Sequence, residues 1–215
     1  AIKKHAKNQD AVIFGICGGY QMLGECIADP YGVEEGGMLR GMELLPMVTE
    51  MEQEKTRTQV DGEFEKLSGV LSVLSGMKLT GYEIHMGASS RTDFTENEMD
   101  MAAADPCQRA RAEILQKSQK QQEMQSRKTK LRRYHNENLC YITDQNGMKK
   151  TDGICKGNIY GTYVHGVFDA DGIAAKIVEA LAAKKGISME TATLQSYQEF
   201  KETQYDKLAD TLREY

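Results

Sequence analysis

The chain has 215 residues, of which 40% are hydrophobic and 27% charged, and its net charge is −5. This composition is ordinary for one soluble globular domain with a sizeable core. The small negative charge gives no reason to expect nucleic acid or an anionic membrane as a partner. No apolar run approaches the ~20 residues of a transmembrane helix. Five cysteines at irregular spacing form neither a disulfide framework nor a zinc motif, so we expect a reducing, cytoplasmic location and no metal site.

The first part of the chain predicts a strand, a tight turn and a helix. Residues 2–8 are typical of the end of a helix, and the apolar run 11–16 is typical of a buried parallel strand. A glycine-flanked turn follows, and residues 20–27 have helical spacing. Because the chain runs into this strand almost at once and has no initiator Met, we expect its true N-terminus and the first strands of its sheet to lie upstream.

The later elements alternate between strands and helices. Residues 29–43 contain Pro30 and several glycines, which predict a loop. We expect strands at 44–51, 56–60, 77–85, 139–143 and 159–164. Residues 171–185 form an amphipathic helical pattern with Gly186 at the C-cap, and helix is expected again from 189 toward 212. The whole chain is interpreted as one domain, residues 1–215.

Residues 96–135 differ in composition from the rest of the domain. Nine Lys or Arg and only two Glu lie between Arg109 and Arg133. We interpret this segment as a basic helical insertion on the surface. A solvated helix is the simpler reading and a docking surface the alternative. Nucleic-acid binding is not expected, because aromatic residues are not interleaved with the basic ones.

The segment Gly15-Ile16-Cys17-Gly18-Gly19 has the form of a nucleophile elbow, in which glycines flank a reactive residue between a strand and a helix. At a helix N-terminus the helix dipole lowers the pKa of a thiol and favours the thiolate. The N–H of Gly18 follows the nucleophile and is placed to stabilise an oxyanion. A buried structural cysteine is the competing interpretation of Cys17.

His165 comes at the end of the predicted strand 159–164. In an open α/β sheet the carboxyl ends of parallel strands share one edge, and the elbow lies on that edge. A lone histidine is more often a surface or satisfied core residue. Together with Cys17, however, it suits a Cys–His pair that folding brings together.

Three motifs in this order resemble those of class I glutamine amidotransferases, in the branch that includes the cobyric acid synthases. They are Gly-Ile-Cys-Gly-Gly-Tyr-Gln-Met-Leu-Gly at 15–24, Gly-Tyr-Glu-Ile-His-Met-Gly at 81–87 and Tyr-Gly-Thr-Tyr-Val-His-Gly-Val-Phe-Asp at 160–169. The tail 205–213 is similar to the C-terminal helix of that branch. The resemblance covers nearly all of the chain outside the insertion. It implies an α/β fold of three layers, flavodoxin-like or Rossmann-like, here without its first strands.

The resemblance also implies a reaction. The Cys17 thiolate would attack the side-chain amide of glutamine, and His165 would protonate the departing ammonia and then activate water. Gly18 would supply an oxyanion donor, and Gln21 matches a position that contacts the substrate glutamine. The simpler reading of Gln21 is an ordinary polar residue on the first helical turn.

One position departs from the wider superfamily. Many class I amidotransferases place a Glu two residues after the histidine to orient it, and this chain has Val167 there. Glu83 and His85 are the candidates for a third member of the triad. Structural hydrogen bonding and contact with a partner domain are the alternatives for both. Asp169 lies too far along the turn to be a convincing substitute.

The chain lacks a G-x-x-x-x-G-K-[ST] phosphate loop, so no cofactor is expected on it. By the resemblance, ATP and Mg would bind an upstream synthetase domain. That domain would use the ammonia to amidate a corrinoid acceptor, the carboxylates of adenosylcobyrinic acid a,c-diamide. We expect residues 1–215 alone to have weak glutaminase activity or none. The open alternatives are a cobyrinic acid a,c-diamide synthase, a cell-wall amidotransferase, a Cys–His hydrolase or peptidase on the same fold, and a non-catalytic binding module.

Overall fold

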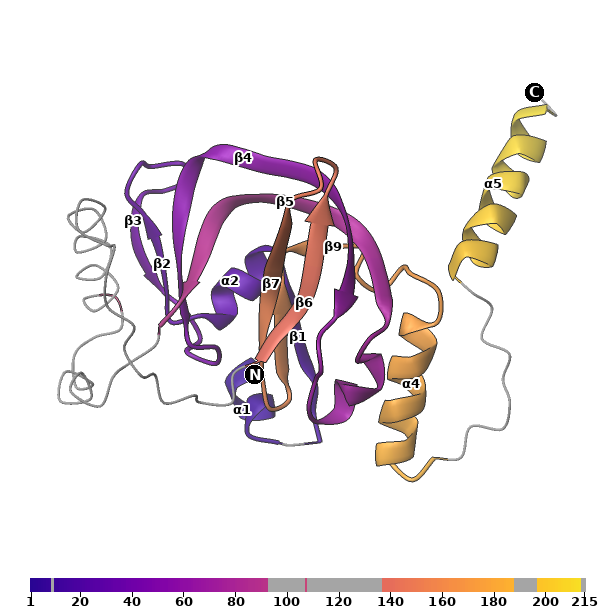
Figure 1. Ribbon diagram of the computed structural model, residues 1–215, viewed down its shortest axis with the longest axis horizontal. Coiled ribbons are helices and arrows are strands. Elements are labelled where there is room, and N and C mark those ends of the chain that lie inside the picture. Colours follow the sequence, from indigo (N-terminus) through magenta and orange to yellow (C-terminus); the bar gives the residue numbers. More distant parts are fainter. Residues whose placement is uncertain (9, 93–106, 108–136, 188–196, 214–215) are drawn as a thin grey trace.

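The computed structural model describes residues 1–8, 10–92, 107, 137–187 and 197–213 (Figure 1). The helical elements are α1 (Ile2–Ala6), α2 (Gly18–Leu23), the 3-10 helix η1 (Val70–Leu74), α4 (Ile173–Lys184) and α5 (Tyr197–Arg213). The strands are β1 (Ile13–Ile16), β2 (Cys26–Asp29), β3 (Gly37–Arg40), β4 (Met47–Phe64), β5 (Lys78–Arg91), β6 (Glu137–Asp144), β7 (Lys149–Lys156), β8 (Ile159–Thr162) and β9 (Val164–His165).

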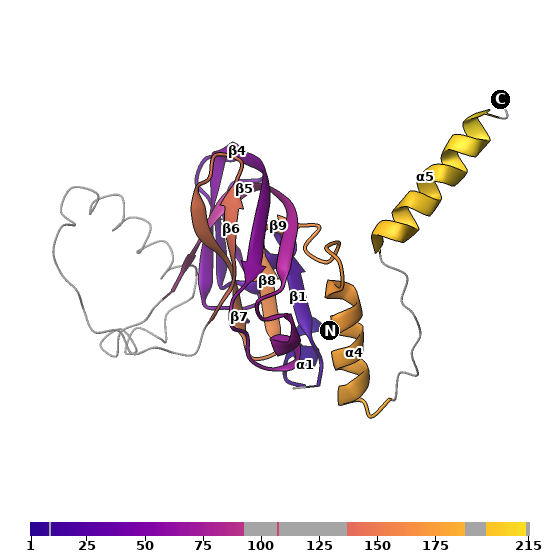
Figure 2. The same cartoon turned by 45° about the vertical axis from the view of Figure 1, so that its right-hand side comes forward.

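Within the described residues the strands form one mixed sheet in the order β1-β8-β7-β6-β4-β2-β3, and β5 pairs with both β4 and β9. The pairs β1–β8 and β2–β4 are parallel, and the other pairs are antiparallel. The long strands β4 and β5 curve together over the molecule (Figure 1), and α4 lies beside the sheet in both views (Figure 2). The parallel pairing of β1 confirms the prediction for residues 11–16.

The alternation of side chains along β1 places helices on both faces of the sheet. Phe14 and Ile16 pack in a core with Ile173 and Ile177 of α4. Ile13, which directly precedes Phe14, packs in a second core that includes residues of α1 and α2. Because neighbouring side chains of a strand point to opposite faces, α2 and α4 cover opposite sides. This arrangement of helix, sheet and helix is consistent with the predicted three-layer α/β fold.

Helix α4 ends as the sequence predicts. Gly186 has a φ of +67°, the left-handed conformation that glycine adopts most readily. The Gly186 N–H donates to the Ala183 carbonyl and the Ile187 N–H to the Ala182 carbonyl, which is the Schellman pattern. The predicted helix 171–185 is observed as Ile173–Lys184.

Two predictions for α2 and the residues that follow it are wrong. Residues 20–27 were expected to be helical throughout, but α2 stops at Leu23 and Ile27 lies in β2. Residues 29–43 were expected to be a loop, but 37–40 form β3, which pairs antiparallel with β2. β3 is an edge strand whose four residues are all exposed, so it lacks the apolar alternation that marks a strand in sequence.

The boundaries of the later strands also differ from the predictions. The two strands expected at 44–51 and 56–60 are one strand, β4, whose pairing with β5 shifts register between Met51 and Thr56. The strand expected at 159–164 is interrupted after Thr162, so His165 lies within the separate strand β9. Strand β7 was not predicted.

The predicted insertion at 96–135 falls outside the described residues except for Cys107, and its interpretation stays a prediction. Among the helices that the structure does describe, none is long and apolar enough to cross a membrane.

Candidate active site

Cys17 stands between β1 and α2 in a strained backbone conformation. Its φ of 54° and ψ of −117° make it one of two described non-glycine residues with positive φ. The Cys17 N–H donates to the Thr162 carbonyl at 2.9 Å, and the thiol donates to the Ile84 carbonyl at 3.4 Å. No atom lies within 4 Å of where a Cβ of Gly18 would stand, so there is open space beside the elbow. As the first helical residue, Gly18 has an N–H without an acceptor inside the helix.

Asp152 on β7 holds the strand that carries His165. Its Oδ2 accepts hydrogen bonds from the hydroxyl of Thr162 and from the N–H of Tyr163, the latter at 3.2 Å. The Thr162 hydroxyl oxygen in turn accepts the N–H of Val164 at 3.0 Å. All these groups are buried, and burial raises the pKa of the Asp152 carboxyl. The interruption between β8 and β9 is therefore fixed by one carboxyl group, which the sequence analysis did not identify.

His165 and the elbow both contact β5. His165 pairs with Tyr82, two residues before Ile84, whose carbonyl accepts the Cys17 thiol. Its Nε2 is buried and has no hydrogen-bond partner within the part of the chain that the structure describes. Cys17 and His165 thus lie at neighbouring strand ends and against the same stretch of β5. A buried imidazole nitrogen without a partner is a group that a substrate atom can satisfy.

One glycine in each of the three motifs stands where two segments approach closely. A Cβ on Gly15 would lie 2.7 Å from Leu23 Cδ1, and a Cβ on Gly81 would meet the His165 carbonyl oxygen. A Cβ on Gly161 would overlap the ring of Tyr20. Only glycine leaves room for the elbow helix and the histidine strand to pack this tightly.

Residues 1–122 match the family of CobB/CobQ-like glutamine amidotransferase domains. The chain belongs to this family. Three curated relatives, all named cobyric acid synthase, are 43% identical over 213 residues (Ruminiclostridium cellulolyticum), 40% over 208 (Lachnoclostridium phytofermentans) and 35% over 221 (Clostridium botulinum strain Langeland). These alignments cover 99%, 97% and 100% of this chain but 34% of each relative. The chain therefore spans about a third of their length. The predicted family and α/β fold are confirmed.

In this amidotransferase domain Glu83 is a buried carboxylate at the centre of β5. Its Oε1 accepts from Lys150 Nζ at 2.9 Å and contacts His85 Nε2 at 3.3 Å. Oε2 is buried without a hydrogen-bond partner among the described residues. Burial raises the pKa of Glu83, but the hydrogen bonds from His85 and Lys150 outweigh it and hold the pKa below its ordinary value. Glu83 therefore contacts His85, and no hydrogen bond joins its side chain to His165 in the described structure.

The second candidate, His85, lies against the strand segment that precedes His165. Its ring stacks on Tyr163 with centroids 3.9 Å apart, and its Nδ1 lies 2.8 Å from the Gly87 carbonyl oxygen. The Tyr163 hydroxyl accepts from Gln21 Nε2 at 3.4 Å. The side chain of Gln21 is thus buried against the domain rather than extended into the space beside Gly18. The three motifs meet in this cluster of Gln21, His85 and Tyr163.

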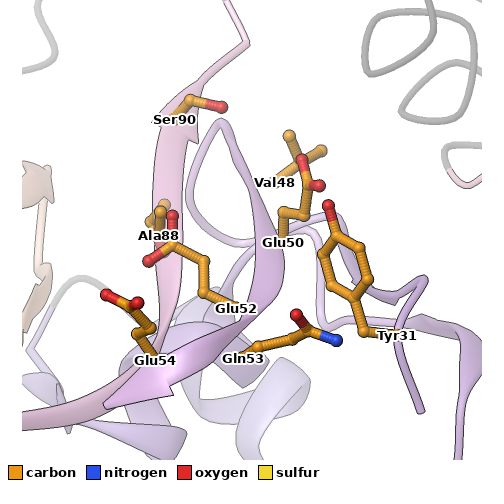
Figure 3. A pocket seen from close by; sticks show the side chains of 9 residues that line it. Tyr31, Val48, Glu50, Glu52, Gln53, Glu54, Ala88 and Ser90 are labelled. Carbon is orange, nitrogen blue, oxygen red and sulfur yellow. The ribbon is translucent and has the colours of Figure 1, made fainter. Parts of the chain in front are cut away.

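A pocket of the amidotransferase domain lies away from the elbow. This pocket of about 500 Å³ lies between β4 and β5, and Figure 3 shows Glu52 and Glu54 of β4 on one side and Glu50 beside Tyr31 on the other. A second pocket of about 330 Å³ is lined by Glu83 and Lys150. Neither is lined by Cys17 or His165. The three carboxylates and the absence of Lys and Arg make the larger pocket unsuited to a carboxylate or phosphate ligand.

Proposed function

We propose that this domain hydrolyses glutamine with Cys17 as nucleophile and His165 as general acid and base. The observation that carries the proposal is the strained Cys17 elbow beside the strand of His165, whose Nε2 is buried without a partner in the described structure. A thiol at a sharp strand-to-helix turn is exposed for attack, and a nearby imidazole can move the protons. Membership of a glutamine amidotransferase family supports glutamine as the substrate.

The reaction would proceed in two stages. The Cys17 thiolate attacks the amide carbon of glutamine, and the N–H of Gly18 stabilises the oxyanion. His165 Nε2 protonates the amide nitrogen, which leaves as ammonia and gives a glutamyl thioester on Cys17. His165 then removes a proton from water, whose attack on the thioester releases glutamate and restores the Cys17 thiolate beside a protonated His165. Open space beside Gly18 leaves room for the substrate amide.

We further propose that the ammonia supports ATP-dependent amidation of a corrinoid carboxylate, as the resemblance to the cobyric acid synthase branch implies; the relatives named cobyric acid synthase support this choice of branch. ATP, Mg and the corrinoid would bind a synthetase domain elsewhere in the longer protein, because this chain contains no phosphate loop. Gln21 is buried and donates a hydrogen bond to the Tyr163 hydroxyl, which supports a packing role for its side chain. Its contact with substrate glutamine stays a prediction, as do the alternatives of a different acceptor or hydrolase activity.

A glutamine-analogue chloroketone, which alkylates a glutaminase nucleophile, tests the proposal. We expect it to label Cys17 in the full-length protein, glutamine to protect, and Cys17→Ala to abolish both labelling and glutaminase activity. His165→Asn should slow ammonia release by about 10²–10⁴-fold. Cys140→Ser is the matched control, because the Cys140 thiol on β6 is fully buried and its replacement should leave the rate unchanged. Labelling without protection by glutamine, or faster hydrolysis of peptides than of glutamine, would favour the alternative hydrolase.

Glu83 is tested separately as an orienting residue. It is opposite Val164, the residue directly before His165, in the β5–β9 pair, so we expect it to act on the histidine by positioning this backbone. Glu83→Gln keeps the size of the side chain and removes its charge. A lowered kcat with unchanged KM and a shifted pH profile would support the orienting role. An unchanged glutaminase rate would remove Glu83 from the triad.

A further inference from the structure

Two cysteines far apart in the sequence meet at the start of β2. The sulfurs of Cys26 and Cys107 lie 2.7 Å apart although 81 positions separate the residues. Cys26 is fully buried and Cys107 is half-buried. Both pack with Val48 in a small core cluster of their own. Neither residue has a role in the proposed glutamine chemistry.

The position of Cys26 is well fixed by its neighbours. It pairs with Arg40 of β3 on one side and with Val48 of β4 on the other, so its backbone is held from both directions. A disulfide places its sulfurs about 2.0 Å apart. A movement of less than about 1 Å would therefore convert the observed contact into a bond.

We propose that Cys26 and Cys107 form a reversible disulfide, which makes this pair an oxidation site of the domain. In a reducing compartment such disulfides are usually transient and redox-sensing. The bond would tie residue 107 to the strand that directly follows the elbow helix α2. The proposal does not depend on glutamine hydrolysis.

A small organic disulfide can serve as the oxidant. The half-exposed Cys107, as thiolate, attacks one of its sulfurs, giving a mixed disulfide and releasing one small thiol. The Cys26 sulfur then attacks the Cys107 sulfur and releases the second small thiol. The protein loses two electrons and the protons of both thiols, and the organic disulfide becomes two thiols.

The other cysteines are differently placed. The Cys140 thiol donates to the Asp152 carbonyl at 3.6 Å, and the Cys155 thiol donates to the Asn138 carbonyl at 3.8 Å. Burial raises the pKa of the Cys140 thiol far above its ordinary value, which makes it unreactive. These contacts predict that oxidation selects the 26–107 pair and leaves the thiols of β6 and β7 reduced.

Hydroxyethyl disulfide and mass spectrometry test the proposal in the 215-residue chain. The Cys17→Ala background keeps the elbow thiol from competing. We expect the intact mass to fall by two hydrogens, free thiols to fall from four to two, and peptide mapping to join residues 26 and 107. A reductant should reverse all three changes.

Cys107→Ser and Cys26→Ser should each abolish the internal bond, whereas Cys140→Ser should retain it. Cys107→Ser is the milder variant, because its site is only half-buried, and its thermal unfolding reports whether the fold is intact. Mixed adducts at Cys107 without a cross-link in the Cys17→Ala chain would overturn the proposal. So would a cross-linked peptide that joins a different pair of cysteines.

Discussion

Replacing Asp152 by Ala should both destabilise the domain and slow the reaction of Cys17. The substitution removes the single acceptor that serves the hydroxyl of Thr162 and the N–H of Tyr163. Both donors are buried, and the methyl group of alanine offers neither of them a partner. The Thr162 carbonyl, which accepts the Cys17 N–H, would then be free to move with its strand.

The size of the effect follows from the two donors that lose their acceptor. Each buried donor without a partner costs about 1–3 kcal/mol, so Asp152→Ala should lower the free energy of unfolding by about 2–6 kcal/mol. Asp152→Asn keeps an oxygen acceptor of the same size and removes a buried charge. We expect its cost to stay below about 2 kcal/mol.

The two variants should also differ in pH dependence. Burial raises the folded pKa of Asp152, so the wild-type fold binds more protons than the unfolded chain between the ordinary and the raised pKa. The extra proton binding stabilises the fold; this contribution is fully present below the unfolded pKa of Asp152 and is lost as pH rises through its folded pKa. Asp152→Asn does not titrate, so its stability relative to wild type should improve as pH rises through the same window.

Urea unfolding at several pH values measures the stability of both variants, and the rate of chloroketone labelling reports on Cys17. We expect both the free energy of unfolding and the labelling rate to decrease from wild type to Asp152→Asn to Asp152→Ala. A loss below about 1 kcal/mol in Asp152→Ala would refute the stabilising role of the Asp152 hydrogen bonds. Labelling at the wild-type rate in an equally folded Asp152→Ala would show that these hydrogen bonds do not position the elbow.

Three further changes test other parts of the site. Cys17→Gly should be about 1 kcal/mol more stable than Cys17→Ala in urea unfolding, because glycine relieves the positive-φ strain; equal stability would argue against a strained elbow. Gly161→Ala should lose about 1–3 kcal/mol by pushing a Cβ into the tyrosine ring of α2, whereas Gly19→Ala, with open space around it, should lose much less; similar losses in thermal melts would contradict this packing. Lys150→Met removes a cation that keeps Glu83 charged. The lowered pKa of Glu83 contributes stability that is present above its unfolded pKa and lost as pH falls through its folded pKa, and this contribution should shrink by about 1 kcal/mol because the lysine is half-exposed. An unchanged acid-unfolding curve would exclude a stabilising ion pair.

The sequence predicted those elements whose patterns are local. The apolar run of β1, the helix α4 and its Gly186 cap each depend on residues that are close in the chain. The polar residues 52–55 interrupt the apolar pattern of β4, so one curved strand was predicted as two. Strand β7 begins with exposed lysines and a glycine with positive φ breaks its pattern, so nothing in its spacing marked it as a strand.

In the candidate site, too, features set by local sequence could be predicted, and features set by long-range packing could not. Cys17 and His165 could be proposed together because each ends a recognisable strand, and parallel strands bring their ends to one edge. Asp152 could not be found, because its importance depends on the pairing of β7 with β8, which places it beside Thr162. The contact of Glu83 with His85 rather than His165 likewise depends on side-chain packing that the motif does not specify.

The pairing of β1 with β8 has a consequence for how the protein is made. Ile13 is paired with Ile159 and Ile16 with Thr162, so the elbow obtains its neighbouring strand from a segment synthesised much later. Contacts this distant in sequence form slowly, after a large entropic cost of loop closure. During translation Cys17 leaves the ribosome long before Thr162 and His165 exist to surround it. Any product that terminates before β8 would therefore carry the cysteine turn without its hydrogen-bond acceptor or its histidine.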